Sequence, residues 1–390
     1  MKLFKLVLFF SLISISHKGI TQEKKIDFSG HLQNLNTVWI QDISSEWYSS
    51  ASIYNRLNLK WYMNKNWTFS ASARNVMNFG QIIYYGYPYY SELLVQDNGY
   101  MDLTWDWASD SSYVLYSNID RLSLNFTKGK LETTIGRQRI NWGINMVWNP
   151  NDIFNTFNYY DFDYAERPGC DAFRVQYYTG YSSSFEGAVK MDANEEITAA
   201  GMYRFNRWNY DFQVMGGVMT SDVVIGGGWS GNIKNAGFTG EVSYFRDKNN
   251  FADTTGIWVL SAGANYTFRN SLFVHLSGLY TSNGTTGNAG VTNPLDNPFL
   301  NNQQISPKSF TLARYSLFGQ VSYPFTPLIN GDISAIVNPN DGSAYLGPNI
   351  GFSLSDNIVL LLMSQIMIGP PGTEFGGYGS LYYMRLKWSF

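Results

Sequence analysis

Apolar and polar residues alternate with a period of two along most of the chain. From residue 51 to 63 the odd positions are apolar, with Asn55 as the exception, and the even positions are mostly polar. After a short turn at 64–66 the same alternation resumes from 67 to 79. One apolar and one polar face on each segment predict a β-hairpin whose two faces meet different surroundings.

Segments of this kind recur to the end of the chain. We count about eighteen, and about sixteen is the next expectation. Tight connections are expected at 64–66, 128–130, 179–183, 206–208, 232–235, 269–270, 324–327 and 355–357. They alternate with other connections that include long ones at 80–112, 144–170, 283–310 and 370–379. This arrangement predicts an all-β fold, a transmembrane antiparallel β-barrel with short periplasmic turns and long extracellular loops.

The last segment of the chain is the most specific. Tyr382, Met384, Leu386, Trp388 and the terminal Phe390 alternate with mostly polar residues. An aromatic alternating strand with a terminal phenylalanine resembles the assembly signal of bacterial outer-membrane barrels, although the closing strand of a soluble sandwich is the alternative. A sheet in lipid must close, because an open edge would leave backbone groups without hydrogen-bond partners.

The N-terminus has the parts of a secretory signal peptide. Lys2 and Lys5 precede an apolar stretch at 6–15, and small residues lie before Gln22. We therefore expect a signal peptide at 1–21 and an outer-membrane barrel at 22–390, with an uncleaved anchor as the alternative. Cys170 is the only cysteine, which excludes an intramolecular disulfide.

Composition narrows the class of protein further. Aromatic residues make up 17% of the 390 residues and charged residues only 15%, with a mean hydropathy of -0.21. Soluble proteins have charged residues at about a quarter of their positions, so an ordinary soluble enzyme is not expected. The hydropathy excludes a bundle of membrane helices. The net charge of -3 gives no reason to expect a nucleic-acid partner.

The polar phase of the strands carries most of the candidate pore residues, because it would face the lumen if the apolar phase faces lipid. The bases in this phase are Arg56, Arg74, Arg121, Arg174, Arg204, Arg314 and Arg385, with Lys60, Lys190 and Lys387. The acids are Glu132, Glu186, Asp211, Glu241 and Asp332. Arginines facing acids across water would favour small hydrophilic or anionic solutes. The alternative is that these charges neutralise one another in a plugged lumen.

Two long loops carry other candidate chemistry. The loop at 80–112 contains acids and the aromatic residues Tyr84, Tyr85, Tyr87, Tyr89, Tyr90, Trp105 and Trp107. Aromatic rings beside carboxylates suit sugar binding, whereas an aromatic girdle or a constriction loop are the alternatives. In the loop at 144–170, Asp161, Asp163 and Glu166 suggest calcium, with solvated acids as the preferred interpretation. No metal or cofactor is expected.

Three stretches of sequence resemble a known family. They are 136–143 (GRQRINWG), 148–155 (WNPNDIFN) and 167–174 (RPGCDAFR). Together they resemble a strand-loop-strand element of Gram-negative outer-membrane porin-like barrels, in a broad group with alginate-export and other anion-handling porins. The resemblance implies that Arg137, Arg139, Arg167 and Arg174 lie at the pore wall or anchor loops. Arg137 and Arg139 share the parity of Ile135, so either a bulge near Gly136 resets the face or the strand leaves the bilayer there.

Transport is favoured over catalysis. The expected mature chain has only His31 and His275, and no catalytic motif accompanies either. We therefore expect a non-enzymatic porin of the bacterial outer membrane for passive passage of small hydrophilic solutes. A non-enzymatic subunit of an assembly, secretion or surface-binding complex is the alternative. The expected partners are outer-membrane lipid and small solutes, and a homo-oligomer or an envelope protein complex stays open.

Overall fold

The computed structural model describes residues 25–44, 46–157, 159–160, 167–289 and 306–390. The expected signal peptide at 1–21 and the acidic group of Asp161, Asp163 and Glu166 lie outside these residues. In the described part of the chain, no helix is long and apolar enough to cross a membrane.

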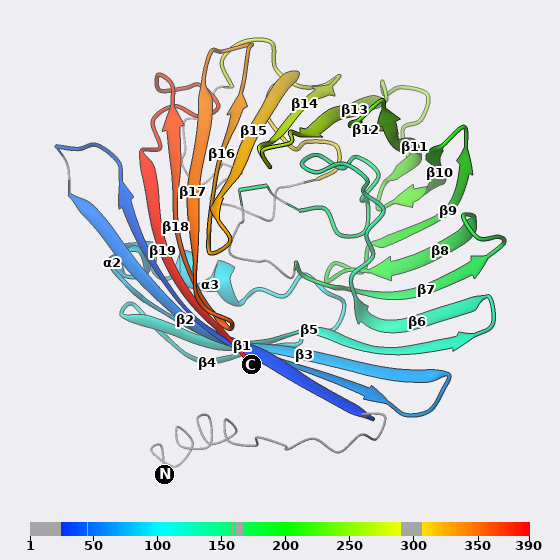
Figure 1. The fold of residues 1–390 in the computed structure, drawn as a ribbon, viewed down its shortest axis with the longest axis horizontal. Helices are drawn as coiled ribbons and strands as arrows, with labels where there is room; N and C mark the ends of the chain where they lie inside the picture. Colours follow the sequence, from blue (N-terminus) through cyan, green and yellow to red (C-terminus); the bar gives the residue numbers. More distant parts are fainter. Residues whose placement is uncertain (1–24, 45, 158, 161–166, 290–305) are drawn as a thin grey trace.

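Eighteen strands of the described chain form a closed antiparallel barrel (Figure 1), which confirms the predicted fold class. Its first nine strands are β1 (Ile26–Ile40), β2 (Trp47–Tyr62), β3 (Trp67–Gly80), β5 (Tyr113–Lys128), β6 (Leu131–Gln138), β7 (Cys170–Tyr178), β8 (Ser184–Met191), β9 (Ile197–Arg207) and β10 (Tyr210–Met219). The other nine are β11 (Asp222–Ile233), β12 (Ala236–Asp247), β13 (Ile257–Thr267), β14 (Phe273–Thr281), β15 (Tyr315–Thr326), β16 (Ile329–Val337), β17 (Ala344–Ser355), β18 (Ile358–Ile368) and β19 (Ser380–Ser389). Each strand pairs with the next, and β1 pairs with β19 to close the wall.

Three short elements lie in the connection from β3 to β5. They are α2 (Gln81–Gly86), α3 (Tyr89–Val95) and β4 (Thr104–Asp110). β4 pairs only with the first residues of β5, from Tyr113 to Asn118, while β6 pairs with the last residues of the same strand. β4 therefore extends the wall beyond the point where β6 ends.

The connections follow the predicted alternation. At one rim the strands are joined by short turns, for example at 129–130, 234–235 and 356–357. The other rim carries the long connections at 139–169, 282–314 and 369–379. The loop at 139–169 begins earlier than expected because β6 ends at Gln138.

The two faces of the wall differ as the alternation predicts. Leu276 is 63% exposed and Leu317 is 54% exposed on the outer face, whereas Glu241 is 1% exposed on the inner face. An apolar outer surface on a closed sheet is what lipid requires, because every backbone group of the wall can then pair within the sheet.

The lumen contains a hydrophobic cluster formed by loops as well as by wall residues. Trp142, Trp148, Phe154 and Tyr160 of the loop at 139–169 are each at most 7% exposed. The rings of Trp142 and Phe154 lie 4.8 Å apart, and Tyr160 lies 5.0 Å from Tyr345 of β17. In Figure 1 loop segments occupy the interior of the barrel outline. The lumen is therefore partly filled.

Candidate functional site

The loop at 139–169 is fixed to the inner wall through Glu241 of β12. The carboxylate of Glu241 accepts hydrogen bonds from three backbone N–H groups of the loop: Ile144, Asn145 at 3.0 Å and Asn151 at 2.9 Å. Glu241 is 1% exposed, so its carboxylate contacts the loop and is shielded from water in the lumen. Hydrogen bonds to a charged acceptor are worth about 1.5–3 kcal/mol each.

Further contacts fix the same loop at both ends of its path. Gln213 of β10 donates from Nε2 to the carbonyl of Trp142 at 2.7 Å, and the Trp142 Nε1 donates to Glu186 of β8 at 2.7 Å. At the far end, Gln365 of β18 donates to the carbonyl of Tyr160 at 2.7 Å. The loop therefore reaches across the lumen from β8 to β18.

Glycines in β11 make room for this loop. A Cβ on Gly226 would lie 2.5 Å from Oδ1 of Asn151, and one on Gly228 would lie 2.8 Å from Cδ1 of Ile144. Between them, the carbonyl of Gly227 accepts a hydrogen bond from Asn151 Nδ2 at 2.9 Å. A side chain on the flanking glycines would keep the loop from reaching the wall.

Asp152 of the same loop is fully enclosed. Its Oδ1 accepts a hydrogen bond from the backbone N–H of Trp142 at 3.3 Å, and its Oδ2 has no partner among the described residues. Burial raises the pKa of Asp152 to about 7, against the opposing attraction of Arg139, Arg167 and Lys190. The docked loop thus contains a carboxyl group that titrates near neutral pH.

A second set of contacts joins the other loops of the same rim. Glu374, in the loop at 369–379, accepts hydrogen bonds from the Leu312 N–H and from Asn338 Nδ2, both at 2.8 Å. Asp341 accepts from the backbone N–H of Glu374 at 2.8 Å. Burial raises the pKa of Glu374 to about 7. Three connections of the rim are therefore linked through one carboxylate.

The inner face of β19, β1, β2 and β3 is basic. His31 of β1, Arg56 of β2 and Arg74 of β3 are neighbours in the sheet register. On the other side of β1, Lys387 and Arg385 of β19 lie opposite Gln33 and Leu35. With Lys60 of β2, which lies opposite Asp27 of β1, the inner face from β19 through β1 to β3 therefore carries five permanent cations.

Asp120 of β5 holds Arg56 of this wall and Arg121 of its own strand. Arg56 is 2% exposed and donates from both terminal nitrogens to Asp120, at 2.9 Å from Nη2 to Oδ1. Arg121 donates to the carbonyls of Asp120 at 2.7 Å and Arg167 at 2.6 Å. Asp120 can point inward beside Arg121 because the register between β3 and β5 shifts there.

Other arginines of the predicted set have different surroundings. Arg74 lies over the ring of Tyr54, with its guanidinium carbon 4.8 Å from the ring centroid. Arg174 is paired with Glu186 at 2.7 Å, and Nη2 of Arg204 donates to the carbonyl of Asn141 at 3.5 Å.

Arg314 does not lie on a wall strand. It precedes β15 and donates from Nε to the carbonyl of Gly284 at 3.2 Å, so it binds the backbone of its own loop. The alternation of the sequence predicts Arg314 in the inward phase of a strand, but β15 begins one residue later, at Tyr315.

The predicted acids do not face the arginines across water as one set. Glu186 and Glu241 are covered by the loop at 139–169. Glu132 lies 4.0 Å from Arg174, and Asp211 accepts a hydrogen bond from Asn206 at 2.8 Å. Asp332 accepts from Gln320 at 3.3 Å. None of these five acids lies on the wall from β19 to β3.

Arg137 is a loop anchor. It contacts Asp171 of β7 at 2.8 Å and Asp97 at 2.6 Å, and it is 3% exposed. Arg137 stays in the outward register of Ile135, and the segment around Asp97 covers it. Of the two roles that the family resemblance implied for Arg137, the structure shows the anchoring role.

The aromatic residues of the first long loop lie near the rim. Tyr85 contacts Tyr84 and Tyr48 edge to face, with ring centroids 5.2 Å and 5.3 Å apart. The other predicted residues of this loop, Tyr87, Tyr89, Trp105 and Trp107, are 42–61% exposed. Sugar binding by this group stays a prediction.

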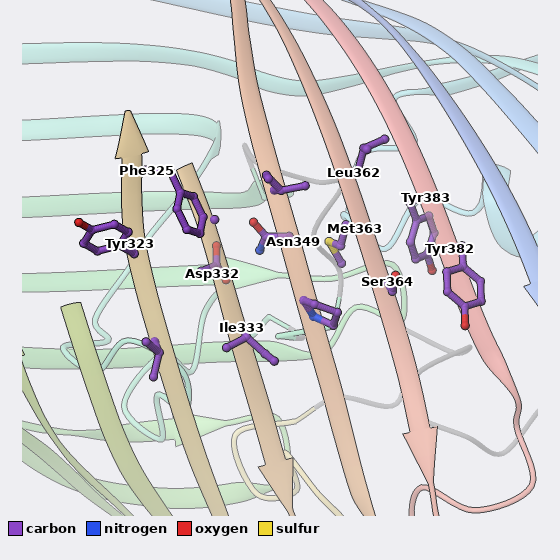
Figure 2. Close-up of a pocket in the computed structure, with 14 residues that line it drawn as sticks. Tyr323, Phe325, Asp332, Ile333, Asn349, Leu362, Met363, Ser364, Tyr382 and Tyr383 are labelled. Atoms are coloured by element: carbon purple, nitrogen blue, oxygen red, sulfur yellow. The ribbon is translucent and has the colours of Figure 1, made fainter. Parts of the chain in front are cut away.

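The outer face of the wall also has a groove, with a cavity volume of about 590 Å³. Figure 2 shows Tyr323, Phe325, Leu362 and Tyr382 among the residues that line it on neighbouring strands. The groove forms because Gly331, Pro348 and Ser364 are small or compact between bulky outer residues. Most of its lining has the outward parity of the strands, so it faces the membrane and is not a solute path.

Sequence reasoning missed three residues of the lumen. Asp120 broke the alternation of β5, and that break was the available signal of a bulge. Gln213 and Asp152 gave no signal, because their partners lie in the folded loop.

His275 is 2% exposed, and neither of its ring nitrogens has a hydrogen-bond partner among the described residues. Within the part of the chain that the structure describes, His275 is therefore hydrogen-bonded to no Ser or acid.

Comparison with known proteins supports the fold. No family model matches the sequence, and no curated protein matches it. The solved structure of OccAB4 from Acinetobacter baumannii is similar, with a TM-score of 0.58, 11% identity, and coverage of 95% of this chain and 99% of that chain. The outer membrane protein OprD from Pseudomonas aeruginosa has a TM-score of 0.57 at 9% identity, over 94% of this chain and 93% of that chain.

OmpF from Salmonella typhi, solved in complex with daunomycin, has a TM-score of 0.50 at 11% identity, over 94% of this chain and 97% of that chain. The narrower resemblance to alginate-export and anion-handling porins stays a prediction. The closed barrel with its apolar outer face has the fold of bacterial outer-membrane porins, and this is a barrel of the outer membrane.

Proposed function

We propose that the protein is an outer-membrane channel for passive passage of small hydrophilic solutes, with a preference for anions. The observation that carries the proposal is the basic inner wall of β19, β1, β2 and β3, which adjoins β18, one of the strands that bind the folded loop. A solute that passes between the loop and this wall meets cations within the reach of one Debye length, about 8 Å at physiological ionic strength.

The folded loop supports the preference for small solutes. Its buried rings and its bonds to Glu241 and Gln365 make it a fixed obstacle in the lumen. It also covers Glu186 and Glu241, which removes two negative charges from the water-filled path. With these two carboxylates covered, we expect the lumen to favour anions, because bases outnumber acids on the inner wall of β19, β1, β2 and β3.

The experiment is single-channel recording of the purified full chain in planar bilayers under a potassium chloride gradient. The proposal predicts discrete conductance steps and a reversal potential shifted toward the chloride equilibrium potential. A barrel without conductance, or one with a cation-selective reversal potential, would overturn it. Among the described residues, no feature of comparable strength favours an assembly subunit or an enzyme.

A further inference from the structure

Two exposed bases lie on neighbouring short turns of the barrel, at the rim that faces the periplasm. Arg207 ends β9 in its outward phase, and Lys234 lies in the turn between β11 and β12. Neither side chain forms an ion pair among the described residues. Tyr210 of β10 connects the two turns, because its hydroxyl donates to the carbonyl of Asn232 at 3.1 Å. The acid nearest in sequence, Asp211, has the inward phase, so the outer side of these turns is positive.

Aromatic rings place these turns at the surface of the membrane. Trp208 is 77% exposed, and the guanidinium carbon of Arg207 lies 5.4 Å from the centroid of its ring. Trp208 contacts Phe212 edge to face at 6.4 Å. Phe212 stacks on Phe205 at 5.5 Å, and Phe205 stacks on Tyr203 at 5.7 Å. An exposed indole beside a guanidinium is typical of the headgroup level, where side chains meet both lipid and water.

A groove on the outer face of β7 to β10 lies next to this aromatic group. Its cavity volume is about 480 Å³. Three glycines in one row of the register form its floor: Gly187 of β8, Gly201 of β9 and Gly216 of β10. Phe185 and Tyr203 pair in the next outward row toward the turns, with ring centroids 4.4 Å apart. The groove therefore opens on the membrane side of the aromatic rings.

The packing of the wall does not require these glycines. A Cβ on Gly187, Gly201 or Gly216 would have no heavy atom within 3.7 Å apart from its chain neighbours, so each position has room for a side chain. Glycine weakens a strand, because it loses the most conformational freedom and has no side chain to pack. Elsewhere the outer face carries large apolar residues such as Leu276 and Leu317. The three glycines thus keep a hollow open in a wall that could be filled.

The separation of the groove from the turn matches one leaflet of the bilayer. Gly201 and Arg207 are six residues apart on β9. Six residues of a strand span about 20 Å, and the usual tilt of barrel strands, about 35–45°, reduces this to a depth of about 15 Å. Half of the hydrocarbon core of a bilayer is also about 15 Å thick. A lipid whose headgroup lies at Arg207 therefore reaches the groove with the end of its acyl chain.

We propose that the outer face of β7 to β12 binds an anionic phospholipid of the inner leaflet of the outer membrane. The phosphate binds between Arg207 and Lys234, because a guanidinium and an ammonium form charge-assisted hydrogen bonds with phosphate oxygens. Trp208 lies at the interface below the headgroup, and one acyl chain fills the groove over the glycines. The charge of the headgroup complements the two bases, and the chain covers apolar surface that the wall leaves hollow.

The groove of Figure 2 lacks this charge. It lies over β15 to β19, whose short turns at 327–328 and 356–357 consist of Pro, Leu, Asp and Asn and carry no base. Acyl chains can enter either groove, but of the two only the groove over β7 to β10 has bases at the headgroup level. Charge complementarity therefore assigns the anionic lipid to the face of β7 to β12.

Titration of the purified full chain with defined lipids tests the proposal. Native mass spectrometry of the chain in neutral detergent gives the dissociation constant of the first lipid bound, for phosphatidylglycerol and for phosphatidylcholine. We expect phosphatidylglycerol to bind more tightly. Arg207→Gln with Lys234→Gln should weaken its binding roughly 25-fold, because each base near an anionic membrane surface contributes about fivefold. Lys25→Gln with Lys65→Gln removes two exposed bases from the same rim beside β1 to β3, and should leave the constant unchanged.

Filling the groove tests the site of the acyl chain without a change of charge. Gly201→Leu should weaken the binding of phosphatidylglycerol, whereas Ser364→Leu, which fills the groove of Figure 2, should not. Heat-modifiable migration in gels shows that each variant is a folded barrel. An unchanged constant in the Arg207, Lys234 variant or in Gly201→Leu would overturn the proposal. So would an equal loss in the Lys25, Lys65 variant, or tighter binding of phosphatidylcholine. None of these results bears on whether the lumen conducts.

Discussion

Arg56 and Asp120 form a buried ion pair on the inner wall, with Nη2 and Oδ1 2.9 Å apart and both side chains at most 2% exposed. Breaking a buried pair by removing one partner costs about 3–5 kcal/mol, because the remaining charge is left uncompensated. Asp120 thus neutralises one of the cations of the basic wall and fixes the bulge from which it projects.

Asp120→Asn is expected to destabilise the barrel by about 3–5 kcal/mol and to increase anion selectivity, because Arg56 loses its counter-charge. Denaturant unfolding in detergent measures the first effect and the reversal potential measures the second. Asp253→Asn, at an exposed connection, is the control and should change neither. Unfolding of the Asp120→Asn chain at the same denaturant concentration as the native chain would refute the role of this pair.

Glu241→Ala should loosen the loop at 139–169, because three backbone N–H groups lose their acceptor at once. The expected result is a larger and noisier single-channel conductance. Glu241→Gln keeps one acceptor oxygen and should show a smaller effect. Conductance steps of unchanged size and noise in the alanine variant would show that the loop does not depend on Glu241.

The stability of the docked loop is expected to depend on pH through Asp152. Its pKa is about 7 when the loop is docked, and near 4 when the loop is released and the carboxyl is solvated. The docked state therefore binds the proton more tightly, and its stability falls as pH rises from about 4 to about 7.

Loop opening should accordingly be more frequent at pH 8 than at pH 5, as measured by fluctuations in single-channel current. Asp152→Asn keeps a side-chain oxygen for the Trp142 N–H and removes the titration, so most of this pH dependence should disappear. If the variant keeps the full pH dependence, another group is responsible, and Glu241, which holds the same loop, is then the first to replace.

Closure of the barrel should be sensitive to Gly30. Gly30 and Phe390 exchange two backbone hydrogen bonds, at 3.0 Å and 2.9 Å. A Cβ on Gly30 would lie 2.4 Å from the carbonyl oxygen of Arg56 and 2.7 Å from the Phe390 ring. Overpacking of this kind costs about 1–3 kcal/mol. Gly30→Ala should lower the folded fraction in heat-modifiability gels, whereas Gly287→Ala, in open space, should not.

The fold could be predicted from sequence because alternation is a local property. Each strand of a membrane barrel places one face in lipid and one in the lumen, so the sequence of Trp67–Gly80 alone indicates both faces. The register shift at Asp120 was harder to predict, since it depends on how β5 pairs with β3.

The contents of the lumen could not be predicted in this way. Glu241 lies 90 residues from its partner Asn151 in sequence, and nothing near either residue indicates that they meet. The same holds for Arg137, which shares the parity of Ile135 in the sequence but whose partner Asp97 belongs to a distant loop. Long-range contacts of this kind decide which charges are covered and which stay in the path of a solute.

The central claim is that the cations on the inner wall of β19, β2 and β3 select anions. The most direct test is the reversal potential of the Arg74→Ser, Lys387→Ser double variant beside that of the unmodified channel, in the same salt gradient. We predict that the unmodified channel reverses near the chloride potential and that the variant shifts toward zero or toward the cation potential. An unchanged reversal potential in an open variant channel would contradict the account.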